Sequence, residues 1–208
     1  MSTKSRYHHG ALREELMRAS LELIESEGLA AVSLRRVARE AGVSPGAPYH
    51  HFADRAALMT ALSTQGFELL RAELQTARDR ADTPMARLAA LADAYVRFAR
   101  ERPAHFRLMF RPELSHSHKH PETSAAGDAA FAVLADTVAE AAAAGALATD
   151  EADILAMTWW SLAHGLASLT LDGKLPDRAA QLGMTVPDLS DRVTRLFADL
   201  VDSTRTRR

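Results

Sequence analysis

The stretch that decides the fold is SLRRVAREAGVSPGAPYHHF, residues 33–52. Ser33 is a favourable N-cap for a short helix, whose apolar face is formed by Leu34, Val37, Ala38 and Ala41 at the i, i+3, i+4 and i+7 positions. Gly42 permits a left-handed turn after this helix. Ser44-Pro45 then has the cap-then-proline order that opens a helix. The stretch therefore predicts two short helices joined by a tight turn.

The second of these helices is polar and aromatic where a buried hairpin needs apolar residues on both faces. Its side chains include Ser44, Tyr49, His50 and His51, with Phe52 as an apolar anchor. A helix-turn-helix places the start of its second helix in the major groove of DNA while the first helix crosses the backbone. We therefore predict a DNA-binding helix-turn-helix. A structural hairpin inside an ordinary helical bundle is the alternative.

Composition favours an all-α protein with no disulfides. The 208 residues contain no cysteine and carry a net charge of −2, so total charge gives no indication of a nucleic-acid partner. Long segments show helical periodicity and none shows sustained alternation. The N-terminus has no apolar run typical of a secretory signal, and no stretch of about 18 apolar residues predicts a membrane span. We expect a cytoplasmic protein that does not associate with membranes.

Proline and glycine positions outline two domains. We expect an N-terminal three-helix DNA-binding domain over residues 1–55, a connecting helix over 54–80, and a helical ligand-binding and dimerisation domain over 81–208. The first helix is expected from about Gly10 to Glu27. Further helices are expected at 85–101, 103–110, 123–144, 151–172 and 189–203. Long loops are expected at 111–122 and 173–188.

Residues 8–60 closely resemble the tetracycline-repressor (TetR/AcrR) family of bacterial regulators. The matching residues are the Glu-Ser-Glu-Gly end of the first helix, Ser33-Leu34, Val37-Ala38, Ala41-Gly42-Val43-Ser44 and Tyr49-x-His51-Phe52. In the C-terminal half, Trp160-x-x-x-His164-Gly165 resembles the signature of one subgroup of that family. The resemblance implies a non-enzymatic, dimeric repressor that leaves its operator when a small molecule binds.

The resemblance also implies which residues contact DNA. The residues expected to face the bases are Ser44, Pro45, Gly46, Ala47, Tyr49 and His50. Arg35 and Arg55 are expected to reach phosphates, where helix N-termini add favourable dipoles. Two positions depart from the family pattern: Pro48 replaces an aliphatic residue and Ala53 replaces a lysine. The basic residues Lys4, Arg6, His8 and His9 form either a DNA-binding arm or a disordered tail.

The last two long helices are amphipathic, so they either close the core of the monomer or pair with a second copy. The resemblance implies the second, as a four-helix bundle on a two-fold axis, which suits a palindromic operator. The expected dimer residues are Leu162, Leu166, Leu169, Val193, Leu196, Phe197 and Leu200.

Large apolar side chains are abundant in the region 85–172. Most belong to the core, but some are expected to line a pocket for a small, largely apolar effector, with His164 as the polar group that orients it. The expected ligand-binding residues are Phe106, Met109, Phe110, Phe131, Trp159, Trp160 and His164.

No pattern predicts a catalytic site, a cofactor or a metal. The sequence has no P-loop, no Gly-x-Ser-x-Gly and no His-Glu-x-x-His. His116, His118 and His120 are potential metal ligands, but they lie in a loop with Lys119 between two of them. Three alternatives to a ligand-responsive repressor stay open. They are an activator, a global regulator of the same fold, and a helical metal sensor or enzyme.

Overall fold

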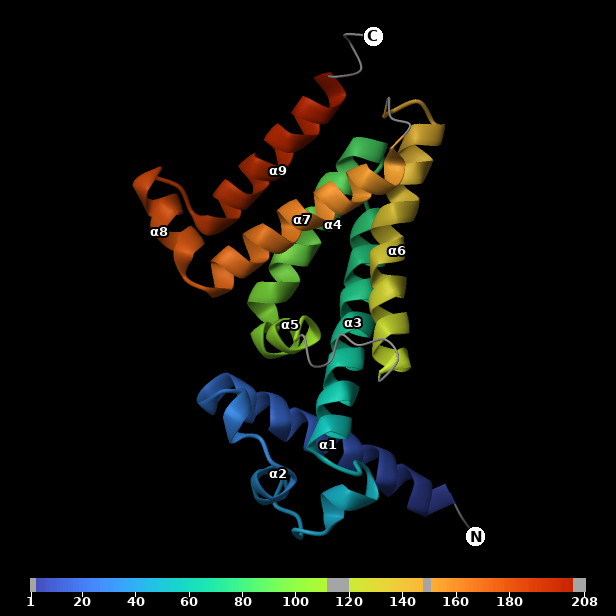
Figure 1. Cartoon of the computed structure of the whole chain (residues 1–208), viewed down its shortest axis with the longest axis vertical. Helices are drawn as coiled ribbons and strands as arrows, with labels where there is room; N and C mark the ends of the chain where they lie inside the picture. Colours follow the sequence, from blue (N-terminus) through green and yellow to red (C-terminus); the bar gives the residue numbers. More distant parts are fainter. Residues whose placement is uncertain (1–2, 112–119, 148–150, 204–208) are drawn as a thin grey trace. The chain divides into compact units, whose positions relative to one another are not determined.

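The computed structural model describes residues 3–111, 120–147 and 151–203. Every regular element in these residues is a helix, which confirms the all-α class (Figure 1). The elements are α1 (Thr3–Glu27), η1 (Leu29–Ala31), α2 (Leu34–Glu40), η2 (Ala47–His50), α3 (Arg55–Asp79), α4 (Pro84–Glu101), α5 (Pro103–Met109), α6 (Pro121–Ala143), α7 (Ala152–Leu171), α8 (Lys174–Gln181) and α9 (Val186–Ser203), where η1 and η2 are 3-10 helices.

The chain divides into two compact units. Unit 1 comprises Met1–Gly66 and Ala104–Ser124, and unit 2 comprises Phe67–Pro103 and Ala125–Arg208. The long helices α3 and α6 contribute to both units. This division differs from the predicted domains 1–55 and 81–208 because α5 packs with the N-terminal helices. The predicted functional division of the chain stays a prediction.

Unit 1 is built around one apolar core. Leu16 and Leu23 of α1, Val37 of α2 and Leu58 and Leu62 of α3 are almost completely buried in it. Phe52, the last residue of the stretch 33–52, also joins this core, and Ala104 and Leu108 join it from α5. Burial of these side chains holds α2 on α1 and α3, which places the helix-turn-helix.

Unit 2 is organised by α4, which packs against both α7 and α9. Leu88 and Phe98 of α4 and Trp159 of α7 are fully buried. The indole Nε1–H of Trp159 donates a 3.1 Å hydrogen bond to the carbonyl of Leu88, and its ring centroid lies 4.9 Å from that of Phe197 on α9. Trp159 therefore joins the three helices at the centre of the unit 2 core.

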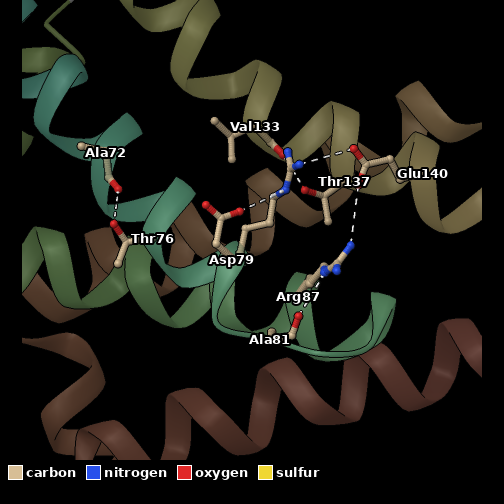
Figure 2. Close-up of polar contacts among 9 residues, drawn as sticks. Ala72, Thr76, Asp79, Ala81, Arg87, Val133, Thr137 and Glu140 are labelled. Carbon is tan, nitrogen blue, oxygen red and sulfur yellow. Dashed lines mark hydrogen bonds and ion pairs between the residues drawn. The ribbon is translucent and has the colours of Figure 1, made fainter.

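The carboxylate of Glu140 on α6 links three helices at the surface of unit 2 (Figure 2). It lies 3.5 Å from Arg78 Nη2 of α3 and 3.8 Å from Arg87 Nη1 of α4. Arg87 also donates to the carbonyl of Ala81 in the α3–α4 turn. Because these ion pairs are partly exposed, each contributes at most about 1 kcal/mol.

The predicted loop at 173–188 is wrong, because residues Lys174–Gln181 form helix α8. Gly173 ends α7 with a φ of 69°, in the left-handed region that glycine adopts readily. Leu175 and Ala179 then lie four residues apart and are buried. Pro176 falls in the first turn, where no intrahelical N–H donor is needed. Helix α1 also starts earlier than expected, at Thr3.

Candidate functional site

The turn of the helix-turn-helix is held by local hydrogen bonds. Ser33 caps α2, because its Oγ accepts the backbone N–H of Arg36 at 3.2 Å. Gly42 has a φ of 67°, which an L side chain rarely adopts. The N–H of Val43 then donates to the carbonyl of Ala38 at 2.9 Å. The glycine turn predicted from the sequence is therefore present.

The recognition segment is a 3-10 turn, η2, where the sequence analysis expected a third α-helix. Its hydrogen bonds run over three residues, from Tyr49 N–H to Gly46 O and from His51 N–H to Pro48 O. Pro48 has no N–H to donate, and its ring is buried. The expected α-helix is corrected to one turn that starts after Gly46.

Most of the predicted base-facing residues lie on the surface of this segment. Ser44, Pro45, Gly46 and His50 are exposed, and Ala47 is half-buried. Tyr49 leaves 53% of its surface exposed, which makes it the large side chain most available in the segment. Pro48 and Phe52 are buried beneath it and hold it in place. This surface offers one phenol and one imidazole as its main polar groups.

The two predicted phosphate-binding arginines differ in their surroundings. Arg35 is exposed in the first turn of α2. Arg55 opens α3 and donates its Nε–H to the carbonyl of Val32 at 2.8 Å and its Nη2–H to the carbonyl of Leu29 at 2.9 Å. Arg55 therefore ties both ends of η1 to the start of α3.

Arg13 is a residue that the sequence analysis missed. Its guanidinium carbon lies 5.4 Å from the ring centroid of Phe52, a cation–π geometry, and its side chain is exposed. The contact joins α1 to the end of the stretch 33–52. No local pattern predicts it, since the two residues are 39 positions apart in the chain.

A polar and aromatic cluster joins α4 to α7 within unit 2. The Nε1–H of Trp160 donates to Tyr95 Oη at 3.3 Å, and Tyr95 Oη lies 2.9 Å from His164 Nδ1. Tyr95 Oη therefore accepts from Trp160 and also shares a hydrogen bond with His164 Nδ1, whose direction is set by the tautomer of the imidazole ring. Phe131 of α6 meets Trp160 edge to face at a centroid distance of 6.0 Å.

Burial keeps this cluster uncharged near neutral pH. It lowers the pKa of His164 below its ordinary value, because the imidazolium form loses hydration. It also raises the pKa of the Tyr95 phenol, and the hydrogen bond from Trp160 opposes that shift only in part. The cluster therefore presents a neutral imidazole and a protonated phenol.

The predicted ligand-binding residues separate into three groups. Phe131, Trp160 and His164 come together in the cluster just described. Phe106, Met109 and Phe110 belong to unit 1, where Phe106 and Met109 are buried. Trp159 makes the core contacts of unit 2. Tyr95, one of the large side chains of the region 85–172, joins this cluster from α4 although it lies 69 positions from His164 in the chain.

The predicted dimer residues all lie on α7 and α9, and they differ in how exposed they are. Leu169, Leu196 and Leu200 are exposed, whereas Leu162, Val193 and Phe197 are half-buried. Leu166 is buried inside the protomer, so it is a core residue of unit 2. Two exposed residues of α7 that the sequence analysis did not single out, Ile154 and Met157, add to the apolar surface.

Three histidines, His116, His118 and His120, are potential metal ligands from the sequence. His116 and His118 lie outside the described residues. His120 Nδ1 lies 3.1 Å from the hydroxyl of Thr60 in unit 1. Within the part of the chain that the structure describes, no three His, Asp or Glu side chains gather in a way that could hold a metal ion.

Helix α7 is, within the described residues, the one helix long and apolar enough to cross a membrane. Its buried side chains, which include Ala156, Trp159 and Ala163, pack in the unit 2 core. A core helix of a bundle has the same length and composition, so this feature is weak evidence for a membrane span.

Comparisons with known proteins agree with this arrangement. Residues 16–62 match the model of bacterial regulatory proteins of the tetR family, and residues 88–202 match that of the tetracyclin repressor-like C-terminal domain. The HTH-type transcriptional regulator BetI of Rhizobium meliloti (strain 1021) is 35% identical over 79 residues, which span 38% of this chain and 39% of that protein.

Solved structures resemble most of the chain. A Rhodococcus sp. RHA1 protein of unknown function superposes with a TM-score of 0.80 at 35% identity, over 94% of this chain and 98% of that one. The TetR family regulator PfmR of Thermus thermophilus shares the fold, with a TM-score of 0.68 at 21% identity over 89% and 96% of the two chains. With both halves of the chain matched by its models, this protein belongs to the TetR family of DNA-binding transcriptional regulators.

Proposed function

We propose that this regulator is a homodimeric repressor that binds a palindromic operator and releases it when a small, largely apolar effector binds in the C-terminal region. The observation that carries the proposal is the apolar surface of α7 and α9, in a chain that also has a helix-turn-helix with an exposed recognition segment. Membership of the TetR family supports the assignment, because such regulators typically combine these functions.

Helices α7 and α9 carry five exposed large apolar side chains. They are Ile154, Met157, Leu169, Leu196 and Leu200. These two helices contact each other within unit 2. Exposed large apolar side chains on neighbouring helices are typical of an interaction site, and a two-fold axis lets the same surface pair with its copy. We infer that a second copy of the chain covers it.

Sedimentation velocity of Leu196→Glu tests the dimer. The carboxylate would lie unpaired in an apolar seam, so we expect a folded monomer, or aggregation, where the wild type sediments as a dimer. Leu182→Glu is the matched control, because Leu182 is at least as exposed (64% against 59%) but lies at the end of α8. A wild-type protein that sediments as a folded monomer at micromolar concentration contradicts the proposal.

Operator binding rests on the exposed recognition segment and on Arg35. A selection from random duplexes at low salt should recover an inverted repeat, with an affinity that falls steeply as salt rises because counterions are released. Tyr49→Ala and Arg35→Ala should each weaken binding by about 1–3 kcal/mol. Arg100→Ala, in an exposed position on α4, is the control. A selection that enriches no duplex refutes operator binding.

The neutral cluster of Tyr95, Trp160 and His164 supports an uncharged effector. Sites of this kind are mostly apolar with a few polar groups that orient the ligand. Tyr95→Phe and His164→Gln should reduce the thermal shift that an active compound produces, while operator affinity without effector stays unchanged. If every compound that shifts the melting temperature acts equally on these variants, the effector binds elsewhere.

An activator or a global regulator of the same fold is the second candidate. A reporter gene behind the selected operator separates the two, since a repressor lowers expression and a deletion of the chain raises it. The opposite response would identify an activator.

A further inference from the structure

Unit 1 contains a cavity that has no part in the proposed function. Its volume is about 190 Å³, and it lies between the end of α1 with η1 and helix α5. Apolar side chains form most of its wall, together with two arginines and one glycine: Ile24, Gly28, Leu29, Ala104, Leu108, Arg107 and Arg111. A mostly apolar lining that also includes two arginines indicates an amphiphilic ligand.

The two arginines reach the cavity from one side of α5. Arg107 and Arg111 are four residues apart, and the N–H of Arg111 donates to the carbonyl of Leu108 at 3.2 Å, so the turn continues past the end of α5. Residues four apart lie on the same helix face. Both residues are exposed, and both line the cavity.

The opposite wall of the cavity is held firmly. Gly28 ends α1 in a left-handed conformation, with a φ of 84°, and its N–H donates to the carbonyl of Ile24 at 3.1 Å. The carbonyl of Leu29 is fixed by Arg55. On the α5 side of the cavity, Ala104 and Leu108 belong to the core of unit 1. The cavity is therefore a preformed feature of the unit.

Volume restricts the size of the ligand. An apolar cavity of about 150 Å³ holds benzene, whereas sites for drug-sized molecules start at about 300 Å³. A volume of about 190 Å³ therefore fits one ring or a short alkyl chain with a small head group. Guanidinium groups pair with carboxylates through two parallel hydrogen bonds.

We propose that this cavity binds a small monocarboxylate whose apolar part is about the size of one aromatic ring. The ring packs on Ile24, Ala104 and Leu108, and the carboxylate meets Arg107 and Arg111. These residues belong to unit 1, whereas the cluster of Tyr95, Trp160 and His164 belongs to unit 2. The site is therefore independent of the effector site proposed above, and it lies in the unit that carries the recognition segment.

Benzoate is the probe, with the full-length protein. Benzoate should raise the melting temperature in a concentration-dependent way, because it binds only the folded state. Benzyl alcohol has the ring without the charge, and acetate has the charge without the ring, so neither should produce the shift at the same concentration. Calorimetric titration then gives the Kd of benzoate.

Two variants remove the site from opposite sides. The double variant Arg107→Gln/Arg111→Gln should weaken benzoate binding by about tenfold or more, because charge-assisted hydrogen bonds are lost. Ala104→Leu should abolish binding by filling the apolar part of the cavity. Arg100→Gln, also an exposed arginine, is the control and should bind as the wild type. Circular dichroism checks that each variant is folded. Loss of benzoate binding in either folded variant supports the site.

Three results overturn the proposal. One is the absence of any benzoate shift or heat in the wild type. The second is equal binding of benzoate and benzyl alcohol. The third is wild-type affinity in a folded Arg107→Gln/Arg111→Gln or Ala104→Leu variant, above all if His164→Gln loses binding, which would locate benzoate in unit 2. Operator binding without benzoate, measured on the same samples, tests the proposed function separately.

Discussion

Met109 lies directly against Gly66, so that a Cβ atom on Gly66 would come within 2.7 Å of Met109 Sδ and 2.8 Å of its Cγ. The same Cβ would lie 3.3 Å from His105 Cβ. Gly66 is on α3, and the other two residues are on α5, within unit 1. A glycine in the middle of a helix normally weakens the helix. At position 66, the missing side chain lets α5 approach α3 closely.

Gly66→Ala should therefore destabilise the protein. The overpacking costs about 1–3 kcal/mol, because the Met109 side chain must repack and His105 Cβ, which is attached to the backbone, must move by a few tenths of an ångström, while the better helix former returns about 1 kcal/mol. We expect a net loss of up to about 2 kcal/mol in urea unfolding. Gly127→Ala on α6 is the matched control, since its Cβ would meet Phe67 at 3.5 Å, an ordinary contact. An unchanged or raised stability of Gly66→Ala would show that α5 adapts freely.

Tyr95→Phe should destabilise unit 2 by about 1–3 kcal/mol, because the variant loses both the hydrogen bond with His164 Nδ1 and the acceptor of Trp160 Nε1–H. Tyr49→Phe is the control, as that hydroxyl belongs to an exposed side chain. Chemical denaturation of both variants is the measurement. If both lose equally little stability, the cluster contributes no more than its apolar contacts.

The lowered pKa of His164 makes stability depend on pH. The unfolded state binds a proton near pH 6.5, whereas the folded state binds it only at lower pH. The unfolding free energy contributed by His164 is therefore fully present above about pH 6.5 and decreases as the pH falls below that value. His164→Gln should show a weaker loss of stability between neutral and mildly acidic pH than the wild type. Thermal melts at several pH values compare the two, and parallel curves would contradict the assignment.

Arg55→Lys separates structural from phosphate-binding roles of Arg55. Lysine keeps the charge but cannot donate to the carbonyls of Val32 and Leu29 with the same planar geometry. We expect a loss of about 1–3 kcal/mol in stability together with weaker operator binding. Arg35→Lys, in an exposed position, should leave stability unchanged. A stable Arg55→Lys protein with normal affinity would mean that charge alone matters at this position.

The helix-turn-helix and the helical class can be predicted from the residues of one short stretch and from helical periodicity. Ser33, Gly42 and the apolar positions of α2 act on neighbouring residues through caps, backbone conformation and helical spacing, and these effects are encoded within a few positions. The family resemblance in the same stretch added DNA binding. Sequence also placed Trp160 and His164 together, because residues four apart share a helix face.

Only the tertiary structure decided which residues complete these sites. Tyr95 reaches His164 across 69 positions, and Met109 reaches Gly66 across 43, so no local pattern contains either contact. Packing also made Trp159 and Leu166 core residues, although their spacing suited a ligand or dimer surface equally well. An apolar residue in an amphipathic helix can face its own core, a ligand or a second copy. The choice depends on which helices pack against it, and that follows from the whole chain.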